Sequence, residues 1–120
     1  MTVMFYQSAE AVQSETSQSW VEIASKVGTL RARTNFLQIY AEYGGTVVDE
    51  PVGIRCLVNG TEQAFDYHTP TIAAQYQAFS VFGIIEPSVE AEYTISLEVR
   101  TLSAGQTVNV RRIRLFVMQE

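Results

Sequence analysis

The chain of 120 residues has one histidine and one cysteine. His68 lies in a loop-like stretch at residues 66–70 (DYHTP), and no glycine pattern typical of a nucleophile elbow accompanies it. A catalytic triad would require this ring to meet a distant serine, which nothing in the sequence indicates. We therefore interpret His68 as a polar surface residue. Cys56 alternates in phase with Ile54 and Val58, which predicts a buried thiol, and a lone cysteine excludes an internal disulfide.

Two groups of carboxylates are candidates for acid–base or metal chemistry. Asp49 and Glu50 stand before a proline in a predicted loop, but a calcium site needs three or more oxygen ligands at alternating spacing. Glu90, Glu92 and Glu98 share the polar face of a predicted strand with threonine, serine and arginine. That arrangement is typical of a solvated sheet surface and not of a glycosidase pair. The sequence therefore predicts no catalytic residue, no metal site and no cofactor.

Arginine is the one basic residue type that is clustered in this sequence. Seven of the eight basic residues are arginine, and Arg111, Arg112 and Arg114 lie within four positions. Such a patch can bind phosphate, but the formal net charge of −5 and the lack of a glycine-rich cradle argue against a nucleic-acid partner. Arginine is enriched and lysine depleted at protein interfaces. We interpret the three arginines as a patch that binds a protein partner, or that pairs with carboxylates within or between subunits.

The elements that must position these side chains are strands. Residues 89–99 are apolar at every odd position and polar at every even one, the pattern of a half-buried strand. Asn59 and Gly60 predict a tight hairpin turn between strands near 52–58 and 61–66. A change of phase near Arg111 and Arg112 indicates a β-bulge in the last strand. Further strands are predicted at residues 2–6, 19–24, 36–43, 75–85 and 107–118.

Residues 1–18 form a part distinct from the sandwich domain predicted at residues 19–120. Val3, Met4, Phe5 and Tyr6 are apolar and β-prone, and the connector that follows is polar. Such a strand can dock on the sheet edge of another chain, or it can be the first strand of its own sandwich, and the sequence leaves both open. We expect no secretory signal and no membrane span, because the chain lacks a basic leader and a long apolar run.

Seven motifs follow one another along the chain. They are the lead QSETSQSW with the strand WVEIA, the strand FLQIYAEYGG, the hairpin GIRCLVNGTEQAF, the strands QYQAFSVFGII and AEYTISLEVRT, the turn SAGQT, and the closing strand VNVRRIRLFVMQE. Their order, over residues 17–120, resembles that of small jelly-roll proteins of tailed-phage particles.

This resemblance implies an all-β fold, an eight-stranded antiparallel jelly-roll sandwich, that assembles as a homotrimer or a similar ring. It implies a non-enzymatic virion structural protein, above all a capsid decoration or cement protein, or else a head-fibre, neck or tail component. Its partner would be the major capsid protein or another virion protein. The chain would be made in the host cytoplasm and act in the virion, at the capsid surface or in the neck or tail.

The alternative function is carbohydrate or receptor binding by the same sandwich at a phage tail or fibre tip. Tyr67, His68 and Tyr76 flank the predicted loop 67–74 and offer aromatic and polar groups for a glycan. The two functions would use different surfaces of the sandwich. The sequence alone does not show on which surface each of these residues lies.

Overall fold

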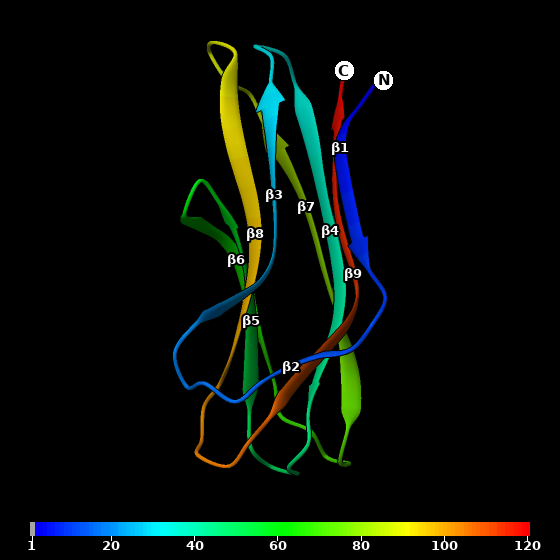
Figure 1. Ribbon diagram of the computed structural model, residues 1–120, viewed down its shortest axis with the longest axis vertical. Coiled ribbons are helices and arrows are strands. Elements are labelled where there is room, and N and C mark those ends of the chain that lie inside the picture. The colour runs from blue at the N-terminus through cyan, green and yellow to red at the C-terminus, as the bar shows by residue number, and fades with distance from the viewer. Residues whose placement is uncertain (1) are drawn as a thin grey trace.

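The computed structural model describes residues 2–120, with the side chains of Thr2 and Phe5 excepted, and the regular elements among them are strands (Figure 1). Within this described part, no helix has the length and apolar character to cross a membrane. The strands are β1 (Thr2–Ala9), β2 (Gln13–Glu15), β3 (Val21–Leu30), β4 (Asn35–Gly45), β5 (Val52–Val58), β6 (Thr61–His68), β7 (Gln75–Ile85), β8 (Ala91–Thr101) and β9 (Val108–Gln119).

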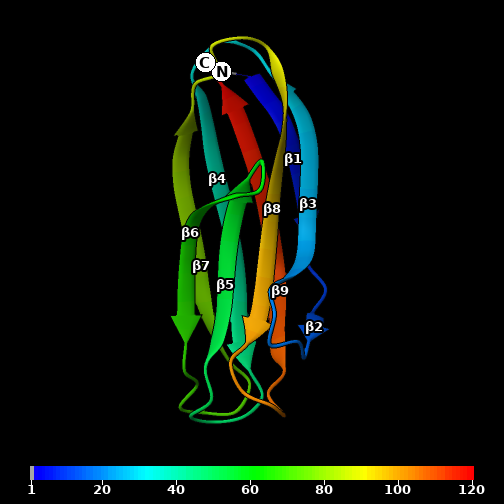
Figure 2. The ribbon, with the colours of Figure 1, turned by 90° about the vertical axis from the view of Figure 1, so that its left-hand side faces the viewer.

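The strands form two sheets that pack face to face (Figure 2). One sheet has the order β1-β9-β4-β7, with β2 also paired to β9, and the other has the order β3-β8-β5-β6. All of these pairs are antiparallel, and apart from the β5-β6 hairpin the paired long strands are not consecutive in the chain. The eight strands of these two orders, four in each sheet, are connected as in a jelly roll, and β2 is a fifth strand of the first sheet. The predicted all-β antiparallel jelly-roll sandwich is confirmed.

The first eighteen residues contain more strand than the polar connector predicted from the sequence. β1 continues to Ala9 beside β9, and β2 adds residues 13–15 to the same partner strand. Backbone amides and carbonyls can pair whatever their side chains are, so a segment without an apolar stripe still forms a strand where a free edge is at hand. β2 is therefore a ninth, short strand beside the eight long ones.

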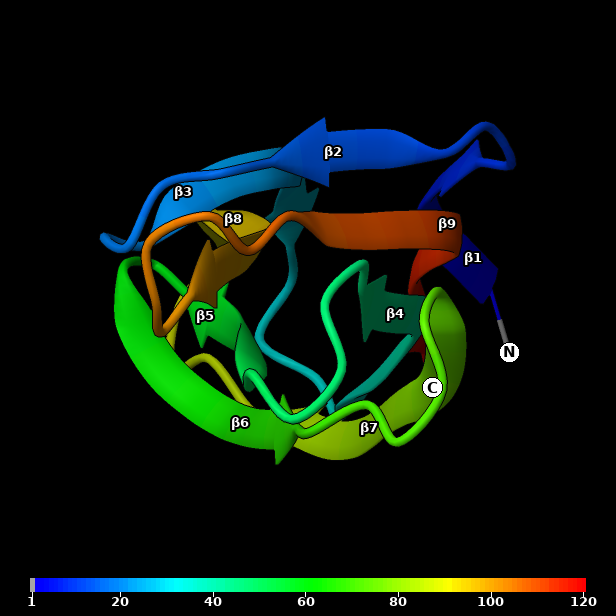
Figure 3. The ribbon, with the colours of Figure 1, turned by 90° about the horizontal axis from the view of Figure 1, so that it is seen from below.

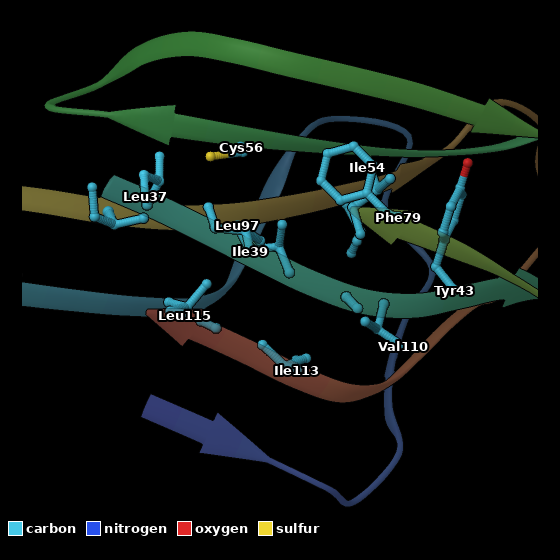
Figure 4. Packing of buried hydrophobic residues seen from close by; sticks show 14 of the residues in the cluster. Leu37, Ile39, Tyr43, Ile54, Cys56, Phe79, Leu97, Val110, Ile113 and Leu115 are labelled. Carbon is cyan, nitrogen blue, oxygen red and sulfur yellow. The ribbon is translucent and has the colours of Figure 1, made fainter. Parts of the chain in front are cut away.

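The hydrophobic core fills the space between the two sheets. Leu37 and Ile39 of β4 and Leu115 of β9 lie across from Ile54 and Cys56 of β5 (Figure 4). All five side chains are buried, since alternate residues of each strand point inward. Burial raises the pKa of the Cys56 thiol to about 12, so this cysteine is a small apolar core residue. The predicted burial of Cys56 is confirmed.

The predicted β-bulge divides β9 into two halves. β4 pairs position 40 with 114 and position 42 with 111, so β9 has one residue more than β4 between these pairs. Arg112 takes the left-handed φ of 53° that accompanies the extra residue. As a result Val110 and Ile113, three positions apart, both face the core, and the arginines beside them face outward.

Asn59 and Gly60 form the predicted tight turn between β5 and β6. Their φ angles are 51° and 78°, which the small asparagine side chain and glycine tolerate. The side chain of Asn59 accepts a hydrogen bond of 2.8 Å from the backbone amide of Thr94 at the neighbouring strand β8. The turn therefore joins two strands and also attaches their tip to the sheet.

Candidate functional site: an outer sheet face

His68 is buried inside the sandwich and not exposed on a loop. β6 continues through His68, and its pairing with Val52 turns this side chain inward, where 8% of the residue is exposed. The imidazole lies edge-on to the ring of Tyr43, with centroids 5.9 Å apart, and its Nε2 has no hydrogen-bond partner in the described part of the chain. The interpretation of His68 as a surface residue is wrong, because the strand extends two residues beyond its predicted end.

The carboxylate of Asp66 accepts hydrogen bonds from side chains of β4 and β7 and does not orient His68. It accepts hydrogen bonds of 2.6 Å from the Tyr43 hydroxyl and 2.8 Å from the Gln77 side-chain amide. Burial, together with this bond to a carboxylate, raises the pKa of Tyr43 above its ordinary value. Across residues 2–120, no three His, Cys, Asp or Glu side chains gather as a metal ion would require.

Val3 and Tyr6 of the N-terminal strand lie on the same outer face of the β1-β9-β4-β7 sheet as the predicted β9 arginines. The pairing of β1 with β9 places Tyr6 opposite Phe116. Val3 and Tyr6 are 55% and 48% exposed, whereas Met4 is turned inward and packs against the core. The side chain of Phe5 lies outside the described residues. Of the three predicted docking residues whose side chains the structure describes, Val3 and Tyr6 are exposed and Met4 is not.

Apolar side chains cover the end of this face where β1 begins and β9 ends. Phe36 stacks on Phe82 with ring centroids 6.2 Å apart, and Tyr6 meets Phe116 edge to face at 5.8 Å. Phe82 and Ile84 are 69% and 56% exposed. We call this surface the aromatic patch. It consists of Val3, Tyr6, Phe36, Phe82, Ile84, Phe116 and Met118.

The other half of the face holds the β9 arginines in a network centred on a carboxylate. Glu42 accepts hydrogen bonds of 2.6 Å from the Tyr40 hydroxyl, 2.8 Å from Arg111 and 3.0 Å from Arg112. These bonds, that of Tyr40 above all, lower the pKa of Glu42 to about 2, so the carboxylate keeps its charge far below neutral pH. The bulge brings the two arginines to the same face, where a carboxylate of the same chain binds them.

Arg114 lies between the network and the aromatic patch. Its guanidinium forms an ion pair with Glu10, which follows β1. Beside it is a shallow cavity of about 320 Å³, lined by Tyr6, Gln38, Tyr40, Arg114 and Phe116. The face therefore combines an apolar area, a shallow depression and a charged border, which are the parts of a protein-binding surface.

The three residues of the predicted glycan site do not lie together. Tyr76 lies on the same outer face as the charged network, 3.8 Å from the guanidinium carbon of Arg111 to its ring centroid. Tyr67 lies on the outer face of the other sheet, beside Trp20, and His68 lies in the core between the sheets. Successive residues of a strand point to opposite sides, so Tyr67 and His68 cannot share one surface.

A second cluster lies on the outer face of the β3-β8-β5-β6 sheet, and the sequence analysis did not identify it. The guanidinium carbons of Arg55 and Arg100 lie 4.6 and 4.9 Å from the ring centroid of Trp20. Arg100 also donates a hydrogen bond of 3.2 Å to the Tyr67 hydroxyl. A side chain at Gly53 would not fit beneath these rings, since its Cβ would lie 2.7 Å from Tyr67. The alternation of polar and apolar residues in the sequence indicated that these arginines face outward. It did not indicate which strands are neighbours, so it could not show that the arginines meet Trp20.

No protein-family model matches this sequence, and no curated protein sequence matches it. The fold is similar to a chain in the structure of the infectious bursal disease virus Gt strain, with 13% identity and a TM-score of 0.61 over 95% of this chain. The match spans 32% of that chain, so the present chain corresponds to about a third of its length. At this identity the likeness bears on the fold alone, and it agrees with the jelly-roll topology.

Two further solved structures are similar at lower TM-scores. One is a family 35 carbohydrate binding module from an environmental isolate, with 16% identity and a TM-score of 0.49 over 99% of this chain and 93% of that one. The other is dimeric latent PorU from Porphyromonas gingivalis, with 9% identity and a TM-score of 0.47 over 99% of this chain and 13% of that one. Neither likeness is close enough to guide a functional argument.

Proposed function

We propose that this chain is a non-enzymatic structural subunit of a virus particle, a decoration protein that binds and stabilises the assembled shell. The observation that carries the proposal is the aromatic patch on the outer face of the β1-β9-β4-β7 sheet. Large contiguous apolar areas are rare on the surface of soluble monomers and are typical of protein-binding surfaces. The jelly-roll similarity to a chain of a virus structure supports the choice of a virus particle as the assembly.

The partner in this proposal is the major capsid protein or another virion protein. The aromatic patch supplies the apolar centre of the contact, and the partly exposed Arg112 and Arg114 supply a polar border. A subunit that binds the assembled lattice and not its free parts adds its binding free energy to the lattice. Several copies joined together would bind more tightly than one, because each contact raises the effective concentration of the next.

The test is co-sedimentation of the purified chain with mature tailed-phage particles, the class of particle whose small jelly-roll proteins the sequence resembles. We expect the wild-type chain to sediment with the particles and Tyr6→Glu to lose most of this binding, because a charge in the apolar centre is costly to bury. Val27→Glu is the matched control, since Val27 is 49% exposed, like Tyr6 at 48%, but lies on the outer face of the other sheet. Equal binding of the two variants would refute the proposed face, and a wild-type chain that stays in the supernatant would refute the function.

The second candidate function is carbohydrate binding at the cluster of Trp20, Tyr67 and Arg100. It is favoured by one observation, the gathering of aromatic rings and arginines on one outer face, with Phe65 beside Tyr67 at 5.7 Å and 58% exposed. Sugar sites combine such rings with a few fixed polar groups. We expect Tyr67→Ala to abolish binding on a glycan array and Tyr76→Ala, on the opposite face, to preserve it. A wild-type chain that binds no glycan would exclude this function.

A further inference from the structure

We propose that two copies of this chain pair through their β7 strands, edge to edge and antiparallel, about a two-fold axis at Ser80. The two β1-β9-β4-β7 sheets would then join into one continuous sheet. This contact concerns the chain by itself and is made by the β7 edge, whereas the shell contact includes Tyr6 and Phe116 of β1 and β9. Phe82 and Ile84 of β7 belong to both surfaces. The contact between β7 strands would remain even if the chain bound no virus particle.

β7 is a free edge on the open side of the sandwich. It ends the β1-β9-β4-β7 sheet, β6 ends the other sheet, and the two lie side by side (Figure 3). Two adjoining depressions of about 340 and 460 Å³ lie between them, both lined by β6 and β7 residues, and the smaller one also by Leu37 and Val58. Every second amide and carbonyl of an edge strand points away from its sheet, so this edge can accept another strand.

The residues of β7 lack the features that normally protect an edge from pairing. All eleven residues from Gln75 to Ile85 are uncharged, and none is proline. The other edges differ: β6 carries Glu62 and Asp66, and β3 carries Glu22 and Lys26. β1, the remaining edge, lies beside β3 on the closed side of the sandwich (Figure 2). Long, uncharged and apolar edges associate unless something covers them.

The sequence of β7 is complementary to itself when it is read in opposite directions about Ser80. In this register the small Ala78 lies opposite the large Phe82 of the second copy, and Gly83 lies opposite Gln77. Two further pairs join an aromatic to a β-branched side chain, Tyr76 with Ile84 and Phe79 with Val81, and the outermost pair is Gln75 with Ile85. Aromatic and β-branched residues are favourable cross-strand partners, and no pair brings two charges of the same sign together.

A second copy is the occupant that this edge fits best. It supplies an uncharged, apolar strand of the same length, and a two-fold contact satisfies both copies at once. The β7 strand of the second copy would bury part of the exposed Phe82 and Ile84 side chains. It would also cover the two depressions between β6 and β7. Strongly charged strands, by contrast, would find no oppositely charged residue on β7 to pair with.

The first test is the mass of the purified chain by light scattering across about a hundredfold dilution. We expect twice the chain mass of 13.4 kDa at high concentration, with dissociation on dilution. Ser80→Lys places like charges at the two-fold axis and should raise the dissociation constant at least about tenfold. Val27→Lys is the control on another edge strand and should leave the mass unchanged. A monomer at all concentrations, or the homotrimer that the phage resemblance implies, would overturn the proposal.

The second test fixes the register by oxidative cross-linking. Directly opposite residues lie within the reach of a disulfide, so Ser80→Cys should form a covalent dimer rapidly. Ala78→Cys should cross-link far more slowly, because four residues at about 3.4 Å each separate the two copies of position 78 in this register. The native Cys56 is buried and does not compete. Equal rates for the two variants would overturn the two-fold at Ser80, and a dimer without cross-linking at either position would overturn pairing by β7.

Discussion

Gln106 fastens a loop to the sandwich through a fully buried side-chain amide. Its Oε1 accepts hydrogen bonds from the backbone amides of Val47 and Thr107 at 2.9 and 3.0 Å. Its Nε2 donates to the carbonyls of Val47 and Glu50 at 2.9 and 2.6 Å. One side chain therefore satisfies four backbone groups of the segment between β4 and β5 and the start of β9. The sequence analysis placed this residue in a simple turn, because a glutamine beside glycine carries no signal of burial.

We expect Gln106→Ala to lower the free energy of unfolding by about 2–4 kcal/mol, since it leaves buried backbone groups without partners. The measurement is urea denaturation followed by circular dichroism. Gln63→Ala is the matched control, because Gln63 is exposed and donates one hydrogen bond, to the carbonyl of Thr61. The control should change stability by less than about 0.5 kcal/mol. If the two variants lost equal stability, the amide would not be a structural support.

At the scale of the element, the bulge in β9 sets which residues of the longest strand face the core. Before it Val108 and Val110 point inward, and after it Ile113, Leu115 and Val117 do so. If the same residues paired without a bulge, one of these two groups would face outward, because side chains alternate with a strict period of two. The bulge also turns Arg111 and Arg112 toward Glu42. One irregularity therefore determines both the core packing and the charged border of the proposed interface.

Deletion of Arg112 should keep the fold, because removal of the extra residue leaves Val110 and Ile113 on the same side of a regular strand. Deletion of Arg114, in the regular part of β9, should lower the melting temperature by more than about 15 °C or prevent folding, because it turns Leu115 and Val117 outward. Arg112→Gly should keep the fold and melt within a few degrees of the wild type, since glycine adopts a positive φ readily while one exposed ion pair is lost. Circular dichroism and resistance to protease provide the comparison. If deletion of Arg112 were as damaging as deletion of Arg114, Arg112 would not be the extra residue of the bulge.

At the scale of the whole molecule, the jelly roll gives the chain surfaces of different chemical character. The outer face of the β1-β9-β4-β7 sheet is apolar at one end and holds the Glu42 network at the other. The outer face of the second sheet has its rings and arginines around Trp20. The open side between β6 and β7 adds an uncharged edge. The aromatic patch and the β7 edge share Phe82 and Ile84. Residues outside this overlap separate the three functions: Tyr6→Glu tests shell binding, Tyr67→Ala tests glycan binding and Ser80→Lys tests self-association.

Local patterns of the sequence determined the strands, the turn at Asn59 and Gly60, the bulge near Arg112 and the burial of Cys56. Each depends on residues that are close in the chain, because side-chain alternation and positive φ are properties of a short segment. The prediction for His68 was wrong because the local pattern ends before this residue, whereas pairing with Val52 extends the strand through it. The short β2 formed for a similar reason, since its partner is β9 and its own side chains gave no signal.

Only the tertiary structure decided which strands are neighbours. β1 pairs with β9 and β4 with both β9 and β7, across separations that alternation does not encode. That pairing brings Tyr6 to Phe116 and Phe36 to Phe82, and it places Tyr67 and Tyr76 on opposite faces. The sequence specifies which side of its strand each residue takes, but a surface is made by residues of several strands. Their register follows from burying all the apolar faces of the chain together in one core.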